Sequence, residues 1–151
     1  MNAEPGLYHY TLCGLDDVYL VNGFTRHDTP YGSGVAIEDV AGLHRVIAED
    51  IIRRRARLNG AEVRFLRKEL DLSQSSLAAL LGVDAQTVAR WEKGQTDVPG
   101  PADRLIRVLY REQASGNPEV RSLIESMADL DQIEHRHRCF EETAEGWRTA
   151  A

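Results

Sequence analysis

The sequence has little of what defines several large protein classes. Among 151 residues it has two cysteines, Cys13 and Cys139, and no CxxC pair, so neither a disulfide scaffold nor a four-cysteine zinc site is indicated. No apolar run approaches the roughly 18 residues that a membrane span needs. Residues 1–10 also lack the basic start and continuous apolar core of a signal peptide. We therefore expect a cytoplasmic protein without a membrane segment.

The motifs of common enzyme families are missing as well. The chain has no GxSxG, no phosphate-binding P-loop, no HExxH, and no glycine-rich loop between a strand and a helix. His9, His27 and His44 stand apart in the sequence, and we expect each to be a surface or capping residue. The sequence therefore predicts no catalytic residue, no metal site and no cofactor.

A net positive charge is also absent, because the chain carries −6 at pH 7. The charge is unevenly distributed, however. Residues 45–68 hold eight basic and three acidic residues, a net +5, whereas residues 1–44 hold one basic and six acidic residues, a net −5. Since phosphates need basic side chains only where the nucleic-acid backbone lies, this pattern is compatible with DNA binding. A solvated helix face equally explains the arginines at 53–57.

The chain is organised around residues 72–94, whose apolar spacing predicts two short helices separated at Gly82-Val83. Asp84 suits an N-cap that starts the second helix. The second helix leaves Gln86, Thr87 and Arg90 facing outward. The positions expected to face the core are Leu72, Leu77, Ala78, Leu81, Val83, Val88 and Trp91. This is the pattern of a helix-turn-helix unit.

The outward face of the second helix carries side chains that can discriminate bases. Gln86 and Arg90 are four residues apart and so share a face. Glutamine pairs bidentately with adenine and arginine with guanine, and the first turn of such a helix reaches base edges in the major groove. We expect residues 84–93 to read double-stranded DNA. The alternative is a helix-turn-helix that serves only packing or dimerisation.

The framework of this unit resembles the Xre/Cro-type family of helix-turn-helix repressors over roughly residues 59–112. The matching residues are Leu72-Ser73-Gln74, Leu77-Ala78, Leu81-Gly82-Val83, Thr87-Val88 and Arg90-Trp91-Glu92-Lys93-Gly94. The resemblance implies a phosphate contact at Gln74 and base reading by Ala85, Gln86 and Arg90. Ala85 is shorter than the polar residue often found there, so the contact expected of it is an apolar one with a thymine methyl group.

Further phosphate contacts are expected around the same unit. The residues expected to contribute them are Ser75, Thr87, Arg64, Arg53 and Arg54. Because helix-turn-helix proteins read two half-sites as dimers, we also expect a homodimer.

The N-terminal part changes pattern from strand to helix. Alternating Tyr8 and Tyr10, the run 18–21 and the run 35–37 predict two or three short strands in one small sheet, with a loop between them at Pro30 to Gly34. From Val40 a helical apolar stripe predicts a helix over about residues 40–57.

This layout, leading into an Xre-type domain, is similar to the N-terminal half of MqsA-type antitoxins. In those proteins the region carries two zinc-binding CxxC pairs, whereas here only Cys13 stands near an expected position, and we expect no zinc. The resemblance supports a second function, an antitoxin that binds a toxin protein and for which DNA binding is secondary.

Three further helices are predicted around and after the central unit. Asn59 and Glu62 form a capping-box pattern at the start of one helix. Pro101 is expected to open another, with Leu105, Val108 and Leu109 facing in and Arg104, Arg107 and Arg111 facing out. Asn117-Pro118-Glu119 starts an amphipathic helix with an apolar stripe to Ile133, which either packs back on the domain or pairs with a second copy.

The C-terminal tail is expected to be polar, apart from the apolar residues Phe140 and Trp147. These two either dock on the body of the protein, dock on a partner, or are mobile. His135, His137 and Cys139 alternate, but three ligands at strand spacing make a weak metal signal.

Together these patterns predict a mostly α fold, with a small N-terminal β-containing element at 1–58, a helix-turn-helix domain at 59–115, and a C-terminal helix and tail at 116–151. The expected function is a dimeric repressor, and the alternative is the antitoxin.

Overall fold

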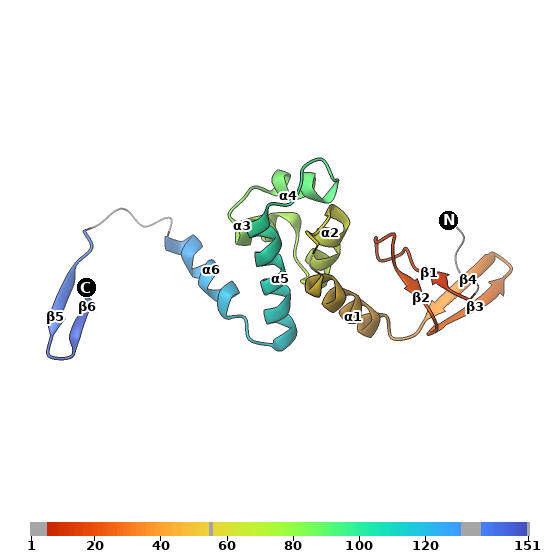
Figure 1. Cartoon of the computed structure of the whole chain (residues 1–151), viewed down its shortest axis with the longest axis horizontal. Helices are drawn as coiled ribbons and strands as arrows, with labels where there is room; N and C mark the ends of the chain where they lie inside the picture. Colours follow the sequence, from red (N-terminus) through yellow and green to blue (C-terminus); the bar gives the residue numbers. More distant parts are fainter. Residues whose placement is uncertain (1–5, 55, 131–136, 151) are drawn as a thin grey trace.

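The computed structural model describes residues 6–54, 56–130 and 137–150, and it shows a helical middle with β-hairpins toward both ends (Figure 1). The helices are α1 (Val40–Arg53), α2 (Gly60–Glu69), α3 (Gln74–Leu81), α4 (Ala85–Glu92), α5 (Gly100–Ser115) and α6 (Glu119–Leu130). The predicted mostly α class, with a small N-terminal β element and a C-terminal helix, is confirmed.

In the described part of the chain the strands form three separate antiparallel pairs. β1 (Tyr8–His9) pairs with β2 (Tyr19–Leu20), β3 (Phe24–Thr29) with β4 (Gly32–Ile37), and β5 (Phe140–Thr143) with β6 (Gly146–Thr149). The prediction of one sheet of two or three strands is therefore wrong for the N-terminal part. The polar run in β3 gave no apolar alternation to recognise, and the glycines of β4 resembled a loop.

The C-terminal hairpin was also not predicted. Its register places Phe140 opposite Thr149 and Thr143 opposite Gly146, with Gly146 in a positive-φ conformation (φ 110°) that favours glycine. Figure 1 shows this hairpin at the opposite end of the molecule from the N-terminal strands.

A single apolar core is shared by α1 to α5 and by the N-terminal Leu15. α1 contributes Ala48, Ile51 and Ile52, and Trp91 of α4 is buried as predicted. The largest fully buried side chains are Leu66, Leu77, Ile106, Val63 and Val88. The helix-turn-helix therefore packs on α1 and α5 as well as on itself.

In α5 the predicted inward and outward positions need correction. Val108 is exposed, whereas Ile106, Leu109 and Tyr110 are buried. Arg107 does not face the solvent but turns toward the chain that follows α1. The apolar pattern misplaced both residues because a polar network, rather than apolar burial, orients this side of the helix.

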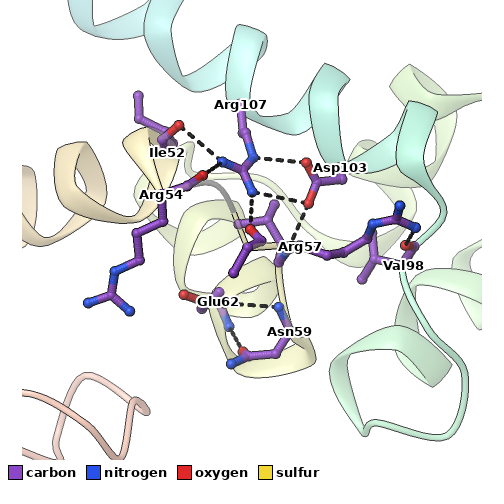
Figure 2. A network of polar contacts seen from close by, with 10 residues as sticks. Ile52, Arg54, Arg57, Asn59, Glu62, Val98, Asp103 and Arg107 are labelled. Atoms are coloured by element: carbon purple, nitrogen blue, oxygen red, sulfur yellow. Dashed lines mark hydrogen bonds and ion pairs between the residues drawn. The ribbon is translucent and has the colours of Figure 1, made fainter.

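That network fixes the connection between α1 and α2 (Figure 2). The Arg107 guanidinium donates to the backbone carbonyl oxygens of Ile52, Arg54 and Ala56, the last at 2.7 Å. It also forms an ion pair with Asp103 at 2.8 Å, and Asp103 accepts the backbone N–H of Leu58 at 2.7 Å. These bonds explain why α1 ends at Arg53, four residues before the predicted end.

α2 begins with the predicted capping box. The Asn59 side chain accepts the backbone N–H of Glu62 at 2.8 Å, and the Glu62 carboxylate accepts the backbone N–H of Asn59 at 2.9 Å. The next residue, Gly60, lies directly against the end of α4. A Cβ atom at this position would overlap the backbone carbonyl oxygens of Trp91 and Glu92.

α6 is anchored to α5 at its first turn. The Glu112 carboxylate accepts the backbone N–H groups of Val120 and Arg121, at 2.7 and 3.2 Å. Ile124 packs against the core, while Leu123 and Met127 of the predicted stripe are exposed. The helix thus packs back on the domain and still presents apolar side chains to solvent.

Candidate nucleic-acid interface

The turn between α3 and α4 has the geometry that the sequence predicts. Ser73 caps α3 by accepting the backbone N–H of Ser76 at 3.0 Å. α3 ends at Gly82 in the left-handed conformation (φ 73°), which glycine adopts at little cost. The backbone N–H of Val83 then returns to the carbonyl oxygen of Ala78 at 3.0 Å. This closed turn fixes the angle at which α4 leaves α3.

Asp84 caps α4 and stays ionised at neutral pH. One carboxylate oxygen accepts both the Thr87 hydroxyl at 2.8 Å and the Thr87 backbone N–H at 2.7 Å. The hydroxyl bond is the main reason, with the backbone bond second, that the pKa of Asp84 is lowered from its ordinary value. The Thr87 hydroxyl hydrogen is therefore already used by Asp84 in the unbound chain.

The exposed side of α4 carries the predicted base-reading residues. Gln86 and Arg90 are exposed, and Ala85 is half-buried at the first turn. Lys93, at the C-cap, is also exposed and lies seven residues after Gln86, so it follows the same helix face. Lys93 was missed as a site residue, although the spacing of 86, 90 and 93 indicates it.

A buried ion pair joins α2 to the end of α4. The Arg67 guanidinium donates to both Glu92 carboxylate oxygens, at 2.7 and 2.9 Å, and to the Leu72 backbone carbonyl at 3.0 Å. The two side chains are only 12% and 5% exposed. Gln74, the first residue of α3, donates its side-chain amide to the same Glu92 carboxylate at 3.2 Å. Glu92 therefore orients Gln74, the predicted phosphate contact.

The remaining predicted phosphate contacts fall into two groups. Ser75, in the first turn of α3, and Arg64, on α2 one turn before Lys68, are both exposed. Arg53 and Arg54, at the end of α1, are instead engaged with carboxylates.

Arg53 lies 3.6 Å from Glu49, and Arg54 lies 2.8 Å from Asp50 and 3.4 Å from Asp17. The hydrogen bond to Asp50 raises the pKa of Arg54. A phosphate must compete with these acids for either arginine.

The described part of the chain holds no group of three or more His, Cys, Asp or Glu side chains that could hold a metal ion. Of the alternating tail residues, His135 lies outside the described residues, and Cys139 is exposed. No helix within the described ranges has the length and apolar character needed to cross a membrane.

Comparison with known protein families identifies the central unit. Residues 63–101, from α2 through α4 into the start of α5, match the helix-turn-helix family model of Xre/Cro type. No curated protein and no solved structure matches the chain. The family resemblance inferred from the sequence is confirmed for this segment.

Proposed function

We propose that the chain is a DNA-binding regulator that acts as a sequence-specific transcriptional repressor, a function supported by the helix-turn-helix family match of Xre/Cro type over residues 63–101. The observation that carries the proposal is the exposed face of α4. Its polar side chains stand on a helix whose opposite side is fixed by buried Val88 and Trp91. A helix held in this way presents base-reading groups at a defined position in the major groove.

Base readout is assigned to the first two turns of α4. Gln86 pairs with adenine and Arg90 with guanine, while Ala85 contacts a thymine methyl group. Lys93 adds a positive charge one turn beyond Arg90, beside the same groove. Phosphate contacts are assigned to Gln74, Ser75 and Arg64, and to Thr87 and Arg53 where the DNA displaces the acidic residues that they contact, Asp84 and Glu49. Arg54 is not assigned one, because Asp17 and Asp50 both bind it.

The repressor acts as a homodimer on two half-sites. The exposed apolar residues Leu123 and Met127 of α6 support a contribution of this helix to the dimer contact. In this proposal residues 59–115 bind DNA, residues 116–151 contribute to assembly, and residues 1–58 form a separate element with its own role.

A second candidate function is that of an antitoxin whose main task is to bind a toxin protein. It is favoured by aromatic side chains that stand in solvent at both ends of the molecule. Tyr31, at the tip of the β3–β4 hairpin, is 99% exposed, and Trp147 of β6 is 73% exposed. Side chains of this kind are enriched at protein–protein interfaces.

The test is fluorescence anisotropy of the purified chain with its own upstream DNA and with a scrambled duplex. We expect preference for the upstream DNA, and Gln86→Ala and Arg90→Ala should remove it, each costing about 1–3 kcal/mol at one base position. Arg104→Ala is the matched control, because Arg104 is an exposed arginine on α5, outside the base-reading face. Equal weak binding to both duplexes, unchanged by the α4 variants, would overturn the repressor proposal.

A salt titration separates the phosphate contacts from base readout. The logarithm of affinity should fall with the logarithm of salt concentration by about 0.9 for each phosphate neutralised. Arg64→Ala should reduce this slope by about one and weaken binding to both duplexes alike.

A further inference from the structure

An open apolar groove lies where the N-terminal strands meet α1, and none of its lining residues belongs to α4. Its volume is about 310 Å³. Its apolar lining comes from Val18, Tyr19 and Leu20 on one side and from Leu43, Val46 and Ile47 on the other. Val46 is apolar and sits in the middle of α1, yet it is 68% exposed. The groove thus offers an apolar surface that residues 6–54, 56–130 and 137–150 leave uncovered.

The charged side chains lining this groove are mainly acidic. Among the described residues, Asp17, Asp50 and Glu62 line it together with one cation, Arg54, and their net charge is −2. Arg54 lies between Asp17 and Asp50, at 3.4 and 2.8 Å, so both carboxylates are shared with a single guanidinium. All three side chains are about half exposed or more. Their outward carboxylate oxygens therefore remain accessible to a second cation.

We propose that this groove binds a segment of a partner protein in which apolar side chains are flanked by lysine or arginine. The apolar side chains fill the space against Val46, and the basic residues pair with Asp17 and Asp50. DNA is unsuited to the groove, because its phosphates would meet carboxylates. The inference rests on the second candidate function, a protein-binding role, and specifies the surface and the chemistry of the partner.

The experiment is a selection from a random-peptide display library on the full-length wild-type chain alone, after which the affinity of each enriched peptide is measured for wild type and for Val46→Lys. We expect the enriched peptides to combine apolar residues with lysine or arginine. They should bind the variant about tenfold more weakly or worse, as expected when an interface anchor is replaced. The double variant Asp17→Asn, Asp50→Asn should weaken binding and reduce its salt dependence. Enriched peptides that are acidic, or that bind Val46→Lys as well as wild type, would overturn the proposal.

Val108→Lys is the matched control, because Val108 is also an exposed valine on a helix, α5, and does not line the groove. This variant should bind the peptides as wild type does, and equal loss in both variants would contradict a groove-specific site. Sedimentation of wild type and Val46→Lys tests a second copy as the occupant, and a change of oligomeric state in the variant would also overturn the proposal.

Operator binding, measured on the same samples, separates this inference from the proposed functions. Val46→Lys should bind operator DNA normally, which also shows that it is folded. If a toxin partner binds Val46→Lys and wild type equally, the groove assignment fails while the antitoxin function stands. If the wild type shows no preference for the upstream DNA, the repressor proposal fails and the groove proposal is unaffected.

Discussion

The helical middle of the molecule and its β-hairpin ends are held together by different kinds of contact. In the middle, the ion pairs Arg67–Glu92, between α2 and α4, and Asp103–Arg107, within α5, have little solvent exposure. At the C-terminal end, Arg148 and Glu141 make an equally short contact, 2.6 Å, but both side chains are about half exposed or more. A short distance therefore does not indicate the same stabilisation in the two regions, because water screens the exposed pair.

This difference follows the division of labour that we propose. A helix that reads bases must be held at a fixed angle, and buried pairs together with a closed apolar core provide that rigidity. Surfaces that meet a partner protein instead need exposed apolar and aromatic side chains. Stability is therefore expected to reside in the middle and to be nearly independent of the ends.

The largest effect is expected at the buried Asp103–Arg107 pair of α5, which holds the chain after α1 by hydrogen bonds to its backbone. Asp103→Ala removes the acceptor of the Leu58 N–H and leaves the Arg107 guanidinium without its carboxylate. Breaking a buried pair from one side costs about 3–5 kcal/mol. Urea unfolding followed by circular dichroism should show this loss in the free energy of unfolding.

Its matched control is Glu125→Ala in α6. Glu125 forms an ion pair with Arg121 at 3.0 Å with the same four-residue spacing as Asp103–Arg107, but in solvent. Exposed helical pairs contribute about 0.3–0.5 kcal/mol. Losses of similar size in the two variants would contradict the contrast between the buried middle and the exposed surface.

A smaller effect is expected where α2 approaches α4. Gly60→Ala places a Cβ atom against the backbone carbonyls of Trp91 and Glu92, which cannot rotate away. Forced overpacking of this kind costs about 1–3 kcal/mol. Gly100→Ala is the control at the first residue of another helix. The nearest atom to a Cβ there is a side-chain nitrogen of Arg57 at 3.6 Å, which is ordinary van der Waals contact. Thermal unfolding should separate the two variants, and equal melting temperatures would contradict the close approach.

Acidification should weaken the start of α4. The hydrogen bonds from Thr87 lower the pKa of Asp84, so its carboxylate favours the folded state above the unfolded-chain value of about 3.9. That contribution is lost as pH falls through the lower, folded-state pKa. Asp84→Asn retains a capping acceptor without titrating in this range. The stability difference between wild type and variant should therefore shrink toward low pH in urea titrations, and a difference that grows would contradict the assignment.

The central unit was predictable from the sequence because its signals are local and redundant. Ser73, Asp84 and Asn59 each cap a helix three residues before the N–H they accept, and the apolar spacing placed Val88 and Trp91 inside. These interactions span one helical turn, so a linear pattern contains them. The family model matched over 63–101 agrees with this segment.

The parts that the sequence did not reveal depend on contacts across long separations. Arg107 reaches carbonyls more than fifty positions earlier, and Gln74 meets Glu92 only once α3 and α4 are folded. The polar strand β3 is defined by its pairing with β4 and not by an apolar pattern of its own. Spacing rules do not describe such pairings, which explains the missed strand, the early end of α1 and the misplaced Arg107.

The smallest effect is expected at the C-terminal hairpin. Trp147 is a large aromatic residue, yet it stands in solvent, so its truncation removes little buried area. Trp147→Ala should change the free energy of unfolding by no more than about 0.5 kcal/mol, as expected for an exposed site. Urea unfolding monitored by circular dichroism measures this directly, and Phe140→Ala, also exposed on the hairpin, serves as a second probe. A loss of about 2 kcal/mol or more from either variant would show that the hairpin packs on the helical middle in solution, and the two regions would then share one core.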